Sequence, residues 1–379
     1  MSRGKWFVCG LSTKSPIFNT NSMTLRIAFG EREHFSYSPK KIPLARGNMA
    51  DKEVGAYMRI FPLFLLATIL VAPVNLSAQG TDGLGMWVWS RSSFSTQESR
   101  ERLVQFCLQH QISHLDVHVE ISWAGRKPAL KNPEALKDLM VLAGQKNITT
   151  SILRGDPRMF FSQKHGQTLE ELRAIMAFSQ TIPKQALLQG IKYDVEPYLT
   201  REWKAGGETR RSVMHDYLSF LRKARLALDE ETPHLLLGVD TPFWWDRDEF
   251  VTEFEGRSQR FSEHVQDLTD FIVIMSYSRD PRKVLASVEG ERRYAERIEK
   301  LVHPSLETIQ LKQDPHISFW GVPSEEFWKA VNQIQEVAKK DPVLGGVRIH
   351  NYRGLMEKLR MNSPYKMDKE VPDQAPYPK

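Results

Sequence analysis

Two carboxylic acids placed two positions apart are the residues of this sequence best suited to chemistry. Asp194 and Glu196 lie in the string GIKYDVEP, residues 190–197. Side chains alternate along a β-strand, so both acids share a face with Lys192, roughly 6.6 Å apart. Repulsion between such carboxylates raises the pKa of one of them, and a general acid needs a carboxyl group that stays protonated near neutral pH. A structural alternative is an ion pair between Lys192 and a carboxylate that closes a barrel.

The elements that must position this pair form a regular alternation of strands and helices. Eight short apolar runs start every 30 to 45 residues, with amphipathic segments between them. The expected strands are Leu84–Trp89, His114–Val119, Ile148–Leu153, Ile191–Glu196, Leu235–Asp240, Phe271–Tyr277, Thr308–Gln313 and Gly346–Asn351. Such alternation predicts a parallel sheet, and eight units in about 270 residues fit a (β/α)8 TIM barrel. A doubly wound open sheet is the alternative, although no Gly-rich nucleotide fingerprint follows any expected strand.

The predicted barrel spans residues 79–360, with a flexible tail at 361–379 and a leader in front of it. Residues 58–78 have the anatomy of a signal peptide: a short basic start at Met58-Arg59, an apolar run to Val74, and a small residue, Ala78, at the end. The apolar run is shorter than the roughly 20 residues that span a bilayer, so a cleaved signal is favoured over an uncleaved anchor. We treat residues 1–57 as a non-native or disordered extension, the alternative being a genuine cytoplasmic tail, and expect the protein to be secreted or periplasmic.

The distribution of charge argues against a nucleic-acid partner. The chain carries a net charge of +6, but residues 79–379 contain 42 basic and 42 acidic side chains. The excess lies in the leader, so the predicted barrel offers no bulk attraction for a polyanion.

Aromatic residues near the expected strand ends suit a carbohydrate ligand. Trp87 and Trp89 share one face of the first strand, and Trp244 and Trp245 follow the fifth strand, after Asp240. Sugar rings have apolar faces that pack on large aromatic side chains. We predict that these residues bind substrate; the alternative is that the tryptophans belong to the core.

The string around the two acids resembles a known signature. It is similar to the strand-four motif D-G-x-D-x-D-x-E of family-18 glycoside hydrolases, the chitinase-like barrels. Gly190, Asp194 and Glu196 match this motif, whereas Gln189 and Lys192 stand in place of two of its acids.

Two further strings resemble motifs of the same family in the expected order along the chain. Met275-Ser276-Tyr277 is similar to the M-x-Y motif on strand six, with Ser278 in place of the usual following acid or amide. Residues 345–350 are similar to G-G-x-x-x-W on strand eight, with His350 in place of the tryptophan. The resemblance covers the layout of the barrel and about a dozen residues in detail.

The resemblance implies a substrate-assisted hydrolysis of an N-acetylated sugar, which departs from the two-carboxylate scheme. It implies that Glu196 protonates the leaving oxygen, that Asp194 orients the acetamido group, and that Tyr277 donates a hydrogen bond to it. His350 is expected to contact substrate. Lys192, in place of an acid, is expected to hold Asp194 ionised and to lower its pKa.

Two rival functions remain open from the sequence. His114, Asp116 and His118 share one face of the second strand, together with Glu120, and imidazole with carboxylate suits a metal-dependent hydrolase; the alternative is a polar network that fills the barrel. The absence of two signature acids motivates a non-catalytic carbohydrate-binding barrel. We expect no cofactor, an oligo- or polysaccharide as partner, and membrane contact only through an uncleaved leader.

Overall fold

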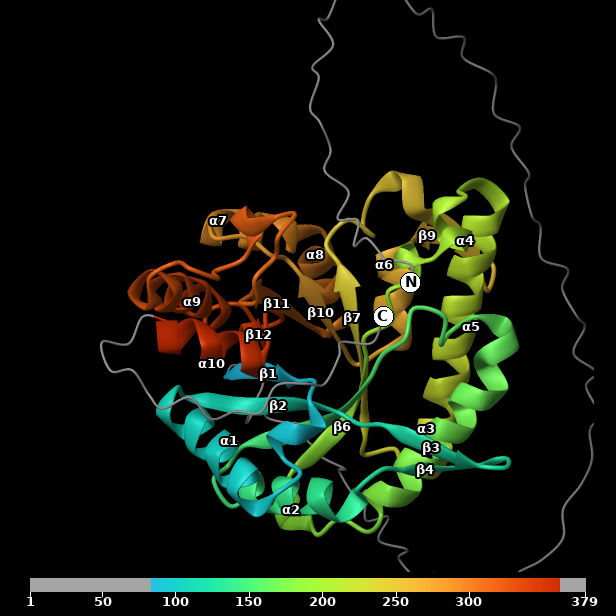
Figure 1. Cartoon of the computed structure of the whole chain (residues 1–379). Coiled ribbons are helices and arrows are strands. Elements are labelled where there is room, and N and C mark those ends of the chain that lie inside the picture. The colour runs from blue at the N-terminus through green and yellow to red at the C-terminus, as the bar shows by residue number, and fades with distance from the viewer. Residues whose placement is uncertain (1–82, 362–379) are drawn as a thin grey trace, which may run out of the picture. The chain divides into compact units, whose positions relative to one another are not determined.

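The computed structural model describes residues 83–361, which form a closed barrel of eight parallel strands surrounded by helices (Figure 1). Neighbouring strands run in the order β1-β12-β11-β10-β7-β6-β5-β2. The barrel strands are β1 (Leu84–Val88), β2 (Ile112–His118), β5 (Thr149–Arg154), β6 (Leu188–Tyr193), β7 (Leu236–Pro242), β10 (Phe271–Met275), β11 (Leu301–Glu307) and β12 (Arg348–His350). The predicted (β/α)8 barrel is therefore confirmed.

Helices connect successive barrel strands and cover the outside of the barrel. The α-helices are α1 (Gln97–Gln109), α2 (Pro133–Gly144), α3 (His165–Ser179), α4 (Arg201–Lys204), α5 (Gly207–Glu231), α6 (Phe261–Leu268), α7 (Pro281–Ser287), α8 (Glu289–Ile298), α9 (Ser324–Ala338) and α10 (Tyr352–Met361). The short 3-10 helices are η1 (Arg91–Ser93), η2 (Ser162–Lys164), η3 (Lys184–Ala186), η4 (Pro197–Leu199), η5 (Asp248–Phe250) and η6 (Pro315–Ile317).

Two antiparallel hairpins are inserted after barrel strands. The first consists of β3 (Ile121–Ala124) and β4 (Lys127–Leu130) and follows β2, and the second consists of β8 (Val251–Phe254) and β9 (Arg257–Arg260) and follows β7. In Figure 1 the first hairpin lies beside α3. Both hairpins leave the C-terminal ends of their strands, which is the end of a TIM barrel where functional residues gather.

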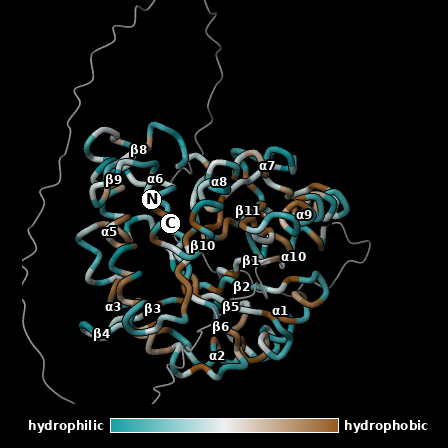
Figure 2. Tube along the Cα trace, turned by 180° about the vertical axis from the view of Figure 1, so that it is seen from behind, coloured by the Kyte–Doolittle hydropathy of each residue, from teal (hydrophilic) through white to brown (hydrophobic). Residues whose placement is uncertain are grey.

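The main hydrophobic core lies between the strands and the helices. The outward side chains of β6 and β7 are apolar, for example Ile191, Tyr193, Leu237 and Val239, and all are buried. Figure 2 shows the hydrophobic residues along the strands and the hydrophilic ones on the outer helices and loops. This alternation places the polar residues of the same strands inside the barrel.

The inside of the barrel is a packed layer of charged and aromatic side chains. Lys192 Nζ donates a hydrogen bond to Asp116 Oδ2 at 2.7 Å and forms an ion pair with Asp240 Oδ1 at 3.0 Å. The same ammonium lies 3.8 Å from the ring centre of Trp87, whose indole N–H donates to Asp240 Oδ2 at 3.0 Å. Burial would raise the pKa of Asp116, but Lys192 and His114 outweigh it and lower that pKa.

One predicted strand is misplaced. The seventh strand was expected at Thr308–Gln313, but β11 ends at Glu307 and the expected segment follows it. Pro304 lies within β11, and proline lacks the N–H that a central strand normally contributes, so it disfavours a strand prediction there. Hydroxyl groups support the ladder beside it: Ser276 Oγ accepts from the Ser305 N–H at 2.9 Å, and Ser305 Oγ donates to the Ile274 carbonyl at 2.7 Å.

The predicted leader lies outside the described residues, which begin at Gly83 and end at Met361, and so does the predicted tail apart from Met361, the last residue of α10. Within that range no helix is both long and apolar enough to cross a membrane.

The Lys192 ion pairs generate a prediction about stability. Lys192→Met keeps the length of the side chain but leaves Asp116 and Asp240 buried without their cation. Removing one partner of a buried pair costs about 3–5 kcal/mol, so urea unfolding should show a loss of that size. Lys339→Met, which removes only an exposed pair with Glu336, should cost less than about 1 kcal/mol. Equal losses in the two variants would contradict this role of Lys192.

Candidate active site

Asp194 and Glu196 lie just beyond the C-terminal end of β6, where the strand pairing stops. The N–H of Asp194 still donates to the Arg154 carbonyl at 2.7 Å, which extends the β5–β6 ladder by one residue. Gly155 makes this close approach possible, because a Cβ atom at that position would lie 2.4 Å from the Asp194 carbonyl oxygen. Both acids are partly exposed. The hydrogen bond to Arg154 and the close approach at Gly155 hold them at the end of the barrel where TIM-barrel chemistry takes place.

The turn that follows folds a tyrosine back onto Glu196. Pro197 begins η4, and its fixed φ suits the first position of a helical turn. The Leu199 N–H donates to the Glu196 carbonyl at 3.1 Å, which closes the turn. Tyr198 therefore donates a hydrogen bond from its hydroxyl group to Glu196 Oε1. The sequence analysis did not identify Tyr198 as a site residue.

The surroundings of the two carboxyl groups raise the pKa of each. Burial, followed by the charge of Glu196, raises the pKa of Asp194 to about 7, against the opposing effects of Lys192 and His350. Burial also raises the pKa of Glu196, although the hydrogen bond from Tyr198 opposes it. Oδ1 of Asp194 is buried and has no hydrogen-bond partner among the described residues. The pair is therefore able to hold a proton near neutral pH and retains an unused acceptor.

Lys192 affects the pKa of Asp194 in the expected direction, but it does not hold that carboxyl group ionised as expected. Lys192 does lower the pKa of Asp194, but burial and Glu196 outweigh it. The ammonium group is engaged one layer deeper, by Asp116 and Asp240. The ion-pair alternative for Lys192 fits this geometry, since both of its partners are carboxylates inside the barrel.

Other predicted site residues gather beside the two acids. Tyr277 follows β10, and its ring centre lies 6.1 Å from that of His350 at the end of β12. Burial raises the pKa of Tyr277, and Glu307, Asp194, Asp240 and Glu196 raise it further, so its hydroxyl stays a proton donor.

His350 connects the predicted Trp89 to a carboxylate that the sequence analysis missed. Trp89 Nε1 donates to His350 Nε2 at 3.0 Å, and His350 Nδ1 lies 3.0 Å from Glu307 Oε2. Glu307 was missed because the seventh strand was misplaced. The signal was present in the sequence, since His303, Ser305 and Glu307 alternate with apolar residues along β11.

Three of the predicted substrate-binding residues are buried. Trp87 and Asp240 belong to the layer around Lys192 and are each 1 % exposed, and Trp245 is fully buried. Trp245 packs in the outer core, with its ring centre 4.6 Å from that of Phe261. The prediction that these three residues contact substrate is thus corrected. Trp244 is partly exposed, and its ring lies edge to face with that of Tyr198 at 5.4 Å.

The side chains of the proposed metal set take part in separate contacts. His114 Nε2 lies 3.1 Å from Asp116 Oδ1, while the other oxygen of Asp116 accepts from Lys192. His118 packs one layer higher, with its ring centre 5.2 Å from that of Trp89. Among residues 83–361, no group of three or more His, Cys, Asp or Glu side chains is arranged to hold a metal ion. The geometry of His114 and Asp116 matches the polar network that was the alternative.

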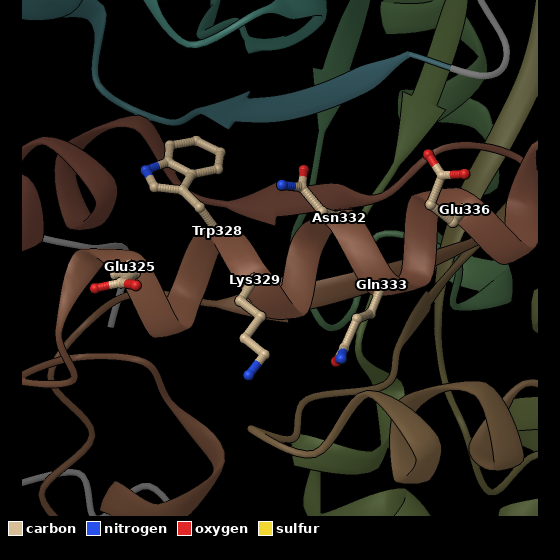
Figure 3. A pocket seen from close by; sticks show the side chains of 6 residues that line it. All are labelled: Glu325, Trp328, Lys329, Asn332, Gln333 and Glu336. Carbon is tan, nitrogen blue, oxygen red and sulfur yellow. The ribbon is translucent and has the colours of Figure 1, made fainter.

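A surface hollow along α9 lies apart from these residues. Its described lining consists of side chains from this one helix (Figure 3): Glu325, Trp328, Lys329, Asn332, Gln333 and Glu336. None of them belongs to the set around Asp194 and Glu196, so the hollow contributes nothing to the candidate active site.

Comparisons with known proteins concern the fold. No protein-family model and no curated protein matches the chain. Similar solved structures include a GH18 chitinase from Cycas revoluta in complex with (GlcNAc)3, with 13% identity and a TM-score of 0.46, covering 73% of this chain and 96% of that one. An endo-1,4-beta-mannanase from Eisenia fetida has 12% identity and a TM-score of 0.48, covering 71% of this chain and 84% of that one. A chitinase from Bacteroides thetaiotaomicron has 13% identity and a TM-score of 0.42, covering 72% and 89%.

These neighbours include the family whose motifs the sequence resembles. The identities are this low and the TM-scores are below 0.5, so the likeness concerns the fold alone.

The contact between Tyr198 and Glu196 generates a prediction. Tyr198→Phe removes a hydrogen bond that lowers the pKa of Glu196, so that pKa should rise in the variant. The side-chain carboxyl carbon signal of Glu196, followed by NMR against pH, measures it. Tyr294→Phe removes a comparable bond to Asp267 on the outer helices and should leave Glu196 unchanged. A Glu196 titration that is identical in the wild type and in Tyr198→Phe would contradict the contact.

Proposed function

We propose that this protein is an exported glycoside hydrolase that acts on an oligo- or polysaccharide. The observation that carries the proposal is the pair Asp194 and Glu196 at the C-terminal end of the barrel, with the pKa of both acids raised. Hydrolysis of a glycosidic bond requires an acid that protonates the leaving oxygen and a group that stabilises the cationic sugar. A carboxyl pair that retains one proton near neutral pH supplies both.

In the proposed mechanism Glu196 is the general acid. Its proton passes to the glycosidic oxygen as the bond between that oxygen and the anomeric carbon breaks. Tyr198 donates to Glu196 and thereby fixes the orientation of the carboxyl group. Glu196 then accepts a proton from the water molecule whose oxygen bonds to the anomeric carbon, so the protonated acid is regenerated.

Asp194 is the assisting group. Its buried Oδ1, which has no partner among the described residues, is free to accept a hydrogen bond from an acetamido N–H of the sugar. The acetamido oxygen would then attack the anomeric carbon, with Tyr277 donating a hydrogen bond to that oxygen. This scheme favours N-acetylated glycans as the substrate class.

Export is proposed from the sequence of residues 58–78 alone. Envelope or environmental glycans would then be the accessible substrates. A non-catalytic carbohydrate-binding barrel is the competing function, and the next experiment separates the two.

Glu196→Gln keeps the shape of the side chain but cannot give up a proton. We expect a loss of turnover of at least about 10²-fold, the usual contribution of a general acid, with glycan binding retained. The measurement is product release from N-acetylated and non-acetylated glycans, together with calorimetric binding. Glu208→Gln, at an exposed position on α5, is the control and should keep full activity. Unchanged binding with no turnover in the wild type would favour the binding barrel.

The raised pKa values predict how activity depends on pH. A general acid must be protonated, so kcat/KM should fall as the pH rises through the pKa of Glu196, which burial raises above its ordinary value. Tyr198→Phe should move this falling limb to higher pH, because it removes a bond that lowers the pKa of Glu196. A kcat/KM profile without a falling limb on the alkaline side of its maximum would be incompatible with Glu196 as the acid.

A further inference from the structure

Three side chains from adjacent strands form a hydrogen-bonded chain beside the two acids. Glu307 ends β11, His350 ends β12, and Trp89 follows β1. In the barrel β12 lies between β11 and β1, so the imidazole lies between the carboxylate and the indole. Nδ1 of His350 is 3.0 Å from Glu307 Oε2, and its Nε2 is 3.0 Å from Trp89 Nε1.

The chemistry of the three groups fixes the direction of these hydrogen bonds. An indole N–H is only a donor, so Nε2 of His350 must accept the bond from Trp89. A neutral imidazole carries its single proton on the other nitrogen, so Nδ1 donates to Glu307. These two hydrogen bonds therefore require a neutral His350 with its proton on Nδ1.

Glu307 is itself held rigidly. Its Oε1 accepts from the N–H groups of Thr308 and Ile309 at 2.7 and 2.8 Å, and the residue is 3 % exposed. Nδ1 of His350 lies 3.1 Å from Oε1 and 3.0 Å from Oε2 of this carboxylate. The two backbone donors fix the position of the Glu307 carboxylate, so the His350 imidazole that contacts it is also fixed. The imidazole in turn fixes the position of the Trp89 indole.

We propose that Glu307 and His350 are positioning residues that hold the Trp89 indole as a fixed platform for the apolar face of a sugar ring, and that protonation of His350 releases it. The proposal rests on the proposed function, because it names the carbohydrate as the ligand of Trp89. Trp89 is partly exposed and lies one layer above the buried Trp87, so it is the member of this strand face that a ligand reaches.

The release depends on the charges around His350. Burial disfavours its protonated form, but Glu307, through its charge and its hydrogen bond, and then Asp194 and Asp240 outweigh burial and raise the pKa of His350. Tyr277 and Trp87 also face the ring, with ring centres at 6.1 and 5.5 Å, and Glu196 interacts with it electrostatically. At a pH above the raised pKa of His350, the neutral imidazole accepts the hydrogen bond from Trp89. At a pH below it, the protonated imidazole and the indole each present an N–H group to the other, and the contact breaks.

The test follows the indole N–H signal of Trp89 by NMR on 15N-labelled protein from pH 5 to pH 9, with the signal assigned from Trp89→Phe. In the wild type we expect it to move with pH between a bonded and a free position. His350→Gln can still donate to Glu307 and accept from Trp89 but does not titrate, so the signal should stay in the bonded position throughout. His350→Phe cannot accept and should leave the signal in the free position throughout. Asp194→Asn should keep the transition and move it to lower pH, because the charge of Asp194 raises the pKa of His350; this assigns the transition to His350.

The Trp123 indole provides a matched control, because it donates to Glu171 on α3, away from His350, and its signal should be the same in all variants. A bonded Trp89 signal in His350→Phe, a transition that persists in His350→Gln, or one that disappears in Asp194→Asn would overturn the proposal. Glycan affinity should fall about tenfold in Trp89→Ala, and His350→Gln should retain affinity down to low pH. The NMR result needs no substrate, so an inactive protein would refute the proposed function without affecting the hydrogen-bonded chain.

Discussion

The cost of placing charge inside a closed barrel is the constraint on which this structure depends. Lys192 is fully buried, and an ammonium group without a counterion at that position would be strongly destabilising. Asp116 and Asp240, from two other strands, meet it together with the face of Trp87. These contacts join β1, β2, β6 and β7, so the charges inside the barrel also connect strands on its opposite sides.

The pKa values of Asp194 and Glu196 depend on this buried layer. Because the ammonium of Lys192 is engaged below, it offsets only part of the burial and repulsion that act on Asp194. The two acids above it therefore keep a proton that fully solvated carboxyl groups would have lost. Tyr198 and His350 lower the pKa of Glu196, whereas burial and the charge of Asp240 raise it, so its pKa is set by the balance between these effects.

The sequence predicted the barrel because eight apolar runs recur at regular spacing, and it predicted Asp194, Glu196, Tyr277 and His350 as neighbours because each lies at a strand end. It failed where periodicity carries no information. Trp244 and Trp245 are adjacent in the chain, yet one is partly exposed and the other buried, since only tertiary packing decides which ring faces the helices. Glu307 was hidden by the proline in its strand, and Tyr198 by a turn whose closure depends on Pro197.

The filled interior also determines how any ligand travels. Trp87, Lys192 and Asp240 are at most 1 % exposed, so solvent reaches Asp194 and Glu196 from the C-terminal side alone. A molecule that binds there has one route for arrival and departure. Under the proposed function, the product must therefore leave by the route through which the next substrate arrives, and the two hairpins after β2 and β7 leave the barrel on that side.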